Sequence, residues 1–189
     1  MTELNTSNIK PDSTKQLATL AGGCFWCIES AFTQVKGIIS ATSGYMGGQT
    51  KSPTYKEVCS GESGHAEVVQ LSFDPELISY QEILEIFFTL HDPTQLNRQG
   101  NDVGTQYRSA IFYHDQNQKD IAEDIIKQMS AANMFEQAIV TQVNKAVTFH
   151  FGEAYHQDYF NNNPENQYCQ AVVSPKLAKF RQTFVNKLK

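Results

Sequence analysis

No stretch of this 189-residue sequence approaches the roughly 20 consecutive apolar residues that a membrane-spanning helix needs. The chain also lacks a basic run outside a mildly lysine-rich C-terminal segment, and 15 Lys and Arg against 20 Asp and Glu give a formal net charge of −5. A nucleic-acid partner is therefore not expected. Residues 1–15 are polar and lack the apolar core and cleavage site of a signal peptide. These absences predict a cytoplasmic protein that does not bind membranes.

Cysteine is scarce and unevenly spaced, with four residues at positions 24, 27, 59 and 169. This spacing does not fit a secreted disulfide framework, and in a cytoplasmic chain it indicates metal binding or redox chemistry. The length and the 40% hydrophobic content suffice for one buried core. We expect a flexible N-terminal segment over residues 1–15 and a single domain over residues 16–189.

The stretch Gly22–Cys27 contains two of the four cysteines and the only tryptophan. Apolar residues follow at helical spacing, at Phe25, Ile28, Phe32 and Val35. The spacing predicts a helix with Cys24 at its N-terminus. Unpaired N–H groups and the helix dipole stabilise an anion at that end, so the pKa of Cys24 is expected below the free-cysteine value of about 8.5.

The rest of the chain alternates between strand and helix patterns without a repeated βαβ period. Alternating apolar residues predict strands near 17–21, 38–43, 65–73, 107–113 and 138–143. Helices are predicted to begin near residues 25, 80, 116 and 175, the second at a capping box of Ser79 and Glu82. Loops are expected over residues 44–53 and 94–106. The pattern predicts an α+β fold, a two-layer α/β sandwich with a mixed sheet and a ferredoxin-like core elaborated by long loops.

Several short strings occur in a fixed order along the chain: Gly22–Trp26, Gly44–Gly48, Pro53–Tyr55, Val58–Gly61, Gly64–Glu67, His91–Pro93 and Gly100–Ser109. Together they resemble the MsrA-type peptide methionine sulfoxide reductases, from about residue 17 to about residue 184. Gly-Cys-Phe-Trp alone would be suggestive. The same string followed by Gly-His-Ala-Glu and Gly-Asn-Asp-x-Gly-Thr-Gln-Tyr-Arg is highly specific.

The resemblance implies an oxidoreductase that repairs proteins after oxidative stress. It implies reduction of the S epimer of methionine sulfoxide, in oxidised proteins and peptides or as the free amino acid. Thioredoxin is the implied reductant, through a redox-active disulfide. We expect a monomer with no metal and no cofactor.

The resemblance also implies roles for individual residues. Cys24 matches the family nucleophile, and Glu67 matches the acid that protonates the sulfoxide oxygen. The matched phenols that hydrogen-bond this oxygen are Tyr55 and Tyr107, and Asp102 matches a further polar residue of the site. The remaining matches are Phe25 and Trp26 in the pocket for the S-methyl group, and Cys169 as the recycling cysteine.

These residue types suit the implied chemistry. A sulfoxide oxygen leaves poorly as an oxyanion, so attack by the Cys24 thiolate needs a proton donor and hydrogen bonds that strengthen as charge develops. Glu67 donates near neutral pH only if its pKa is raised, and burial beside Phe25 and Trp26 would raise it. The reaction leaves a sulfenic acid on Cys24, which a second thiol converts to a disulfide.

Cys27 departs from the commonest family pattern, which has glycine at this position, and it creates a Cys-x-x-Cys spacing. Two interpretations follow. In the first, Cys169 arrives on a flexible tail and attacks Cys24, with Cys27 as a relay. In the second, Cys27 resolves the sulfenic acid directly. The intact sequence around Cys169 favours the first. We expect Cys59 to be a buried structural thiol, and His65 and His156 to orient or pack rather than to catalyse.

Two other protein classes fit some of these residues. A thioredoxin-like disulfide oxidoreductase uses Cys-x-x-Cys at a helix start, but it needs a βαβ opening and a proline at the active site, and neither is apparent in the sequence. A zinc module would use Cys24, Cys27, Cys59 and His65. Its second pair is loosely spaced for a structural zinc site, and Cys169 would be left over.

Overall fold

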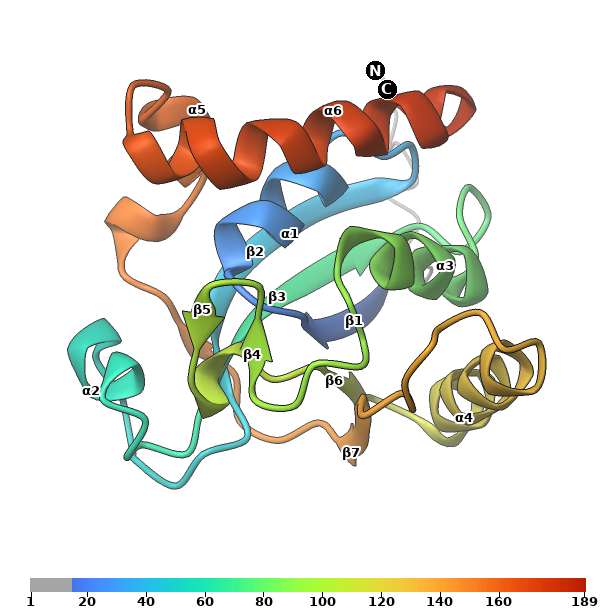
Figure 1. Ribbon diagram of the computed structural model, residues 1–189, viewed down its shortest axis with the longest axis horizontal. Helices are drawn as coiled ribbons and strands as arrows, with labels where there is room; N and C mark the ends of the chain where they lie inside the picture. Colours follow the sequence, from blue (N-terminus) through green and yellow to red (C-terminus); the bar gives the residue numbers. More distant parts are fainter. Residues whose placement is uncertain (1–14) are drawn as a thin grey trace, which may run out of the picture.

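The computed structural model describes residues 15–189 (Figure 1). The segment expected to be flexible, residues 1–15, lies outside the described residues except for Lys15. Strands and helices are interleaved along the chain from β1 (Gln16–Ala21) to α6 (Ser174–Thr183). In the part of the chain that the structure describes, none of the helices has the length and apolar character needed to cross a bilayer.

A six-stranded mixed sheet with the order β7-β6-β1-β3-β2-β8 forms one layer. Its other strands are β2 (Ile38–Met46), β3 (Ala66–Phe73), β6 (Ala110–Tyr113), β7 (Gln142–Lys145) and β8 (His150–Phe151). All pairings are antiparallel except β6 with β7. The inner order β6-β1-β3-β2, with one helix between β1 and β2 and one between β3 and β6, is that of a ferredoxin-like core. The predicted fold class is confirmed.

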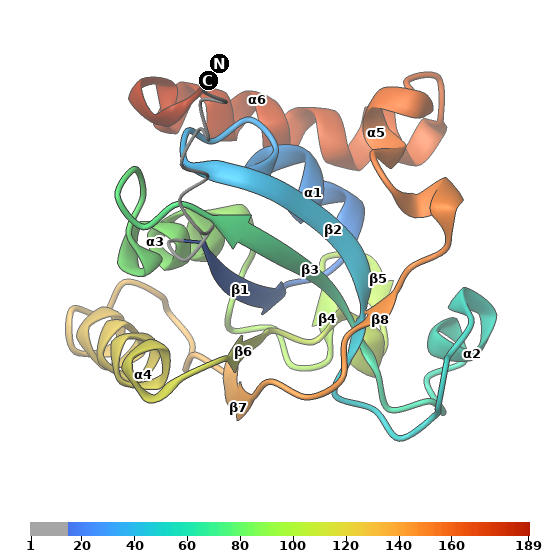
Figure 2. The same cartoon turned by 180° about the vertical axis from the view of Figure 1, so that it is seen from behind.

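The second layer consists of helices on one face of the sheet. The longer helices are α1 (Phe25–Phe32), α3 (Tyr80–Leu90), α4 (Gln116–Ala131) and α6. In Figure 1, α6 runs across α1, and α4 lies beside α3 near β6 and β7. The view from behind shows the strands in front of α1 and α6 (Figure 2). The helices therefore cover one side of the sheet, as the sequence predicts.

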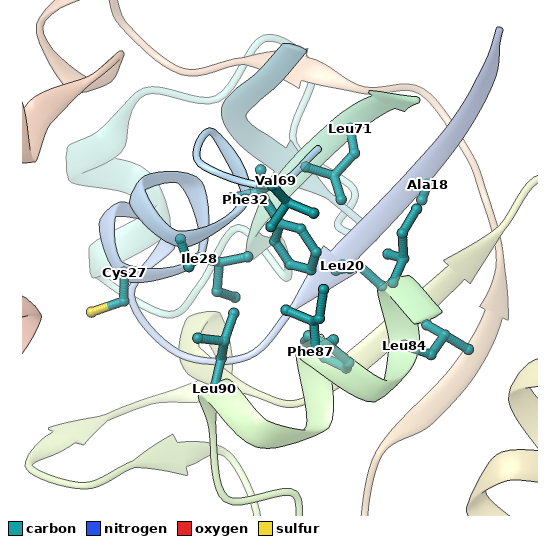
Figure 3. Packing of buried hydrophobic residues seen from close by; sticks show 14 of the residues in the cluster. Ala18, Leu20, Cys27, Ile28, Phe32, Val69, Leu71, Leu84, Phe87 and Leu90 are labelled. Carbon is teal, nitrogen blue, oxygen red and sulfur yellow. The ribbon is translucent and has the colours of Figure 1, made fainter. Parts of the chain in front are cut away.

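The main core lies between these two layers. Ile28 and Phe32 of α1 pack with Phe87 of α3 against Leu20 and Val69 of the sheet (Figure 3). All five side chains are buried. Burying a side chain of this size contributes about 1.5–3 kcal/mol relative to an exposed one. This core fixes α1, and with it the chain segment around Cys24, against the sheet.

The opposite face of the sheet has a smaller apolar cluster of short and medium side chains: Ala21, Met46, Ala66, Val68, Ala110 and Phe112. These residues alternate along their strands with those of the main core. Ala146 and Phe149, between β7 and β8, pack over them. A loop rather than a helix layer therefore covers this face, which keeps the fold two-layered.

Several expected boundaries are wrong. The expected loop 44–53 begins later, because Gly44–Met46 continue β2 in register with Ala66–Val68 of β3. The strand expected from residue 138 begins at Gln142. The strand expected from Tyr107 begins at Ala110, and Tyr107 itself ends a short 3-10 helix, η1 (Thr105–Tyr107). The expected loop 94–106 contains a small hairpin of β4 (Arg98–Gln99) and β5 (Asp102–Val103).

Candidate active site

Cys24 lies at the turn from β1 into α1, where it is the residue that caps the helix. Gly23 before it has φ +88°, and a Cβ there would lie 2.7 Å from Cγ of Gln99. Both the left-handed backbone and the close approach require glycine. The predicted position of Cys24 at a helix N-terminus is confirmed.

Glu67 of β3 reaches the same turn. Its Oε2 accepts a hydrogen bond of 3.0 Å from the N–H of Phe25, the first residue of α1. The side chain is 1% exposed, and burial raises the pKa of Glu67 to about 8, although the N–H of Phe25 acts in the opposite direction. A carboxyl group with this pKa carries a proton at pH 7 and is poised as an acid.

The expected lowering of the Cys24 pKa is wrong for this structure. Burial raises the pKa of Cys24, and a hydrogen bond shared with Cys27 and the negative charge of Glu67 act in the same direction. The N–H of Trp26 lowers the pKa, as a helix N-terminus should, but its contribution is smaller. Without substrate, the Cys24 thiol is therefore neutral near pH 7.

The other matched polar residues lie around the same carboxyl group. Tyr55 begins α2 (Tyr55–Cys59), and Tyr107 ends η1. Burial raises the pKa of both phenols, and the charge of Glu67 raises it further. Asp102 of β5 accepts a hydrogen bond of 2.6 Å from the hydroxyl of Tyr168. Both phenols thus remain hydrogen-bond donors near neutral pH.

The aromatic pocket predicted at Phe25 and Trp26 also includes Tyr159 and Tyr168, and these four side chains are called the aromatic wall below. Trp26 stacks on Tyr159, with ring centroids 3.7 Å apart and planes 5° from parallel. Tyr168 meets the indole edge-on at 5.9 Å. Sequence reasoning missed both tyrosines, because each lies more than 130 positions from Trp26.

His156 packs against the aromatic wall and orients Trp26. Its Nδ1 accepts a hydrogen bond of 3.2 Å from the indole N–H of Trp26, and its ring lies 4.4 Å from that of Tyr55. The side chain is 0% exposed, and burial lowers the pKa of His156, so the ring is neutral at pH 7. The expectation that His156 orients or packs is confirmed. His65 likewise packs a loop, through hydrogen bonds with Gly48 and Thr50.

Glu153 is a second carboxylate that sequence reasoning missed. One of its oxygens accepts a hydrogen bond of 2.7 Å from the Tyr45 hydroxyl, and the other accepts one of 2.7 Å from the N–H of Tyr55. It therefore ties α2 to β2. The available signal was the polar, aromatic run Glu153–Tyr159, which stands out in the sequence.

The cysteines form a group of three and a separate fourth. Cys24, Cys27 and Cys169 are buried free thiols. Cys27 shares a hydrogen bond with Cys24, and burial followed by the charge of Cys27 raises the pKa of Cys169. Cys27 thus influences the pKa of both of the other thiols.

Two expectations about cysteines are wrong. Cys169 is not on a flexible tail: it begins a π-helical turn, η3 (Cys169–Val173), that continues directly into α6, and it is 0% exposed. Val173, Leu177 and Phe180 anchor this helical segment in the core. Cys59 is not buried. It is exposed at the end of α2, where its thiol interacts with the Tyr55 hydroxyl.

A metal centre does not fit the arrangement. Within residues 15–189, no group of three or more His, Cys, Asp and Glu side chains is placed to hold a metal ion. What the residues offer is a nucleophilic thiol, a protonated carboxyl group, two phenols and an aromatic wall. This combination suits attack on a polarised, neutral centre that carries an oxygen and an apolar substituent.

Comparisons with known proteins agree with this chemistry. A family model described as peptide methionine sulfoxide reductase matches residues 16–188. A Chromobacterium violaceum protein named peptide methionine sulfoxide reductase MsrA is 56% identical over 167 residues, covering 88% of this chain and 95% of that protein. A Deinococcus radiodurans protein of the same name is 47% identical over 187 residues, covering 99% of this chain and 91% of that protein.

Solved structures of Saccharomyces cerevisiae Mxr1 are also similar. The reduced form aligns with a TM-score of 0.76 at 32% identity, covering 84% of this chain and 91% of that chain. An unusual oxidised form aligns at 0.59 and 29% identity, covering 85% and 86%. A complex with Trx2 aligns at 0.54 and 24%, covering 82% and 91%. Since a family model spans almost the whole chain and relatives of that name share about half of its residues, this chain belongs to the peptide methionine sulfoxide reductase family.

Proposed function

We propose that this enzyme reduces the S epimer of methionine sulfoxide, free or in oxidised proteins and peptides, with Cys24 as the nucleophile. The observation that carries the proposal is the buried Glu67 carboxyl group, bound to the N–H next to Cys24 and protonated at pH 7. A protonated acid beside a thiol is what a sulfoxide oxygen requires, because this oxygen must gain a proton as its bond to sulfur breaks.

In the first step, the sulfur of Cys24 forms a bond to the sulfoxide sulfur while Glu67 gives its proton to the oxygen. The thiol proton of Cys24 restores the acid form of Glu67. The hydroxyl group then passes from the substrate sulfur to the sulfur of Cys24 as the bond between the two sulfurs breaks, which leaves a sulfenic acid on Cys24 and releases methionine with its sulfur reduced by two electrons. Donation from Tyr55 and Tyr107 stabilises the charge that develops on oxygen.

The aromatic wall explains how an S-methyl group would be bound. Phe25 and Trp26 present apolar surface directly beside Cys24, and a methyl group has no polar atom to leave unsatisfied there. Tyr168, whose hydroxyl donates to Asp102, meets the indole edge-on. When the oxygen points toward Glu67, the methyl group toward the indole and the rest of the substrate out of the site, only one epimer can present the open face of its sulfur to Cys24.

In the second step, the Cys24 sulfenic acid condenses with a thiol to form a disulfide and water. The structure favours Cys27 as this thiol, because Cys27 already shares a hydrogen bond with Cys24. The disulfide then passes by exchange to Cys169, which interacts with Cys27. A thioredoxin dithiol reduces the final disulfide, and the thioredoxin is oxidised. We propose that residues 16–189 form a single catalytic domain that acts as a monomer without a cofactor. We propose the reducing cytoplasm as its location.

A direct test uses the two epimers of methionine sulfoxide with dithiothreitol as reductant. The wild-type enzyme should consume the S epimer and leave the R epimer, and Cys24→Ser should abolish turnover. Cys59→Ser is the matched control and should retain turnover. Reduction of both epimers at equal rates, or reduction that persists in Cys24→Ser, would contradict the proposal.

A further inference from the structure

Glu29 is a buried carboxyl group that the reaction does not use. It lies on α1, one turn after Trp26, and is 2% exposed. Each of its two carboxyl oxygens lies 3.1 Å from the N–H of Asp158, which donates to them. The N–H of Tyr159 and the hydroxyl of Ser43 also face this carboxyl group. Glu29 thus holds the backbone at the start of α5 (Tyr159–Asn162).

The backbone that Glu29 binds also determines the position of the Tyr159 ring. Trp26 and Glu29 are three residues apart on α1 and share one face of the helix. Tyr159 directly follows Asp158, whose N–H donates a hydrogen bond to Glu29, and the ring of Tyr159 stacks on the indole of Trp26 at 3.7 Å. The carboxyl group of Glu29 and the stacked rings therefore act on the same short stretch of backbone.

This backbone needs a restraint. Asp158 has φ +52°, in the left-handed region that is unfavourable for residues with a side chain. The residue before Asp158 is anchored separately. The side-chain amide of Gln157 makes hydrogen bonds with the N–H and C=O of Ser43 at 3.0 and 2.9 Å. If Glu29 is lost, the chain therefore stays attached at Gln157, whereas the backbone of Asp158 and Tyr159 becomes free to move.

We propose that Glu29 is a positioning residue for substrate binding, which fixes the ring of Tyr159 on Trp26 and so sets the aromatic surface that receives the S-methyl group. The proposal deepens the proposed function and rests on it. Glu29 touches no reacting atom. Its loss should weaken substrate binding and leave the chemical step largely intact.

Trp26 is the only tryptophan of the chain, so its fluorescence reports directly on the stacking. In Glu29→Gln, the emission should shift to longer wavelength, and the acrylamide quenching constant should rise about twofold as the ring becomes accessible. The KM for free methionine-S-sulfoxide should rise about tenfold, since one of the two carboxyl oxygens that accept from the N–H of Asp158 is replaced by an amide NH2 group, while kcat stays within about twofold.

Further variants make the test specific. Glu85→Gln, an exposed carboxyl group on α3, is the matched control and should leave KM and fluorescence unchanged. Tyr159→Ala should reproduce the KM and quenching of Glu29→Gln, and the double variant should show no further rise in KM. If Glu29→Gln does not fold, Glu29→Asp is measured instead. It keeps a carboxyl group, but its shorter side chain leaves Asp158 out of reach, so the same changes are expected.

The proposal is overturned if a folded Glu29 variant has wild-type fluorescence, or if kcat falls while KM and fluorescence are unchanged. A failure of the proposed function is a separate result. If the wild-type enzyme reduces neither epimer, the substrate is wrong, whereas the fluorescence of the Glu29 and Tyr159 variants still decides whether Glu29 positions this ring.

Discussion

At the scale of single residues, Glu67 combines two tasks that oppose each other. As an acceptor for the N–H of Phe25 it favours the carboxylate, and as a buried group it favours the acid. Burial is the larger effect, and the pKa of about 8 is the result. The same burial that protonates Glu67 also protonates Cys24, so attack on the substrate must move the thiol proton within the site.

Glu67 makes the rate of sulfoxide reduction depend on pH in a definite direction. In the proposed mechanism the acid form of Glu67 is the proton donor, so the single-turnover rate should fall as pH rises through about 8. Glu67→Gln should lower this rate by about 10²- to 10⁴-fold and remove the descending limb. Rapid mixing of reduced enzyme with methionine-S-sulfoxide from pH 6 to pH 9.5 measures both, with Glu62→Gln as an exposed control. A descending limb retained in Glu67→Gln would assign the proton to another group.

The raised pKa of Glu67 also has a consequence for stability. A group with a folded-state pKa above its unfolded value stabilises the fold below the unfolded pKa of about 4.5, and this contribution is lost as pH rises through about 8. Glu67→Gln removes the cost of burying a charge. Urea denaturation should therefore show that the variant gains stability relative to wild type at pH 9 and not at pH 5. Equal differences at both pH values would mean that Glu67 does not titrate between them.

At the scale of elements, two helices of residues 15–189 begin with capping boxes that stabilise different parts of the molecule. In each, a hydroxyl accepts from the N–H three residues on, and the glutamate there accepts in return: Ser79 with Glu82 begins α3, and Thr54 with Glu57 begins α2. Helix α3 has seven buried residues and α2 has one, Val58. Core packing therefore holds α3 in place, whereas local hydrogen bonds hold α2 and the phenol of Tyr55.

Removal of each cap should separate stability from activity. Ser79→Ala should lower the free energy of unfolding by about 1 kcal/mol and leave kcat/KM unchanged. Thr54→Ala should change the free energy of unfolding less, because α2 contributes little to the core, and lower kcat/KM several-fold as Tyr55 loses its position. Urea denaturation and steady-state kinetics on the two variants test this contrast. A Thr54→Ala enzyme with full activity would show that Glu153 alone positions Tyr55.

At the scale of the whole molecule, the proposed recycling through Cys169 requires a change of structure. Cys169 is packed in a helical turn that continues into α6, with Val173, Leu177 and Phe180 in the core. A disulfide at this position is out of reach of a protein reductant until the turn moves.

The relay through Cys27 predicts where the cycle stops in each variant. Cys169→Ser should reduce one equivalent of sulfoxide and then stall with thioredoxin, because the Cys24–Cys27 disulfide stays buried. Cys27→Ser should also form product once and leave a sulfenic acid on Cys24, which dimedone traps. Mass spectrometry of each stalled enzyme identifies the species. Continued thioredoxin-driven turnover of Cys169→Ser would make Cys27 the final resolving cysteine.

Local patterns in the sequence determined the elements and the order in which they occur. Apolar spacing located α1 and the last helix, the Ser79 box located α3, and alternation located β1 and β3, because each depends on neighbours within one or two turns. The same spacing placed Cys24 at a helix start. The strings around Cys24 and Glu67 carried the family, although nothing local brings β3 to the start of α1.

Tertiary structure alone decided how these residues meet and in which ionisation state. Burial, which depends on the whole fold, reversed the expected pKa shift of Cys24 and raised that of Glu67. Long-range packing brought Tyr159 onto Trp26 and gave Glu29 its hold on Asp158. It also placed Cys169 in the core rather than on a tail, because η3 continues into a helix with an apolar side against α1. The sequence thus identified the residues proposed to react, because their motifs are local. Three-dimensional packing determined their protonation states and their contacts, because both depend on residues far apart in the chain.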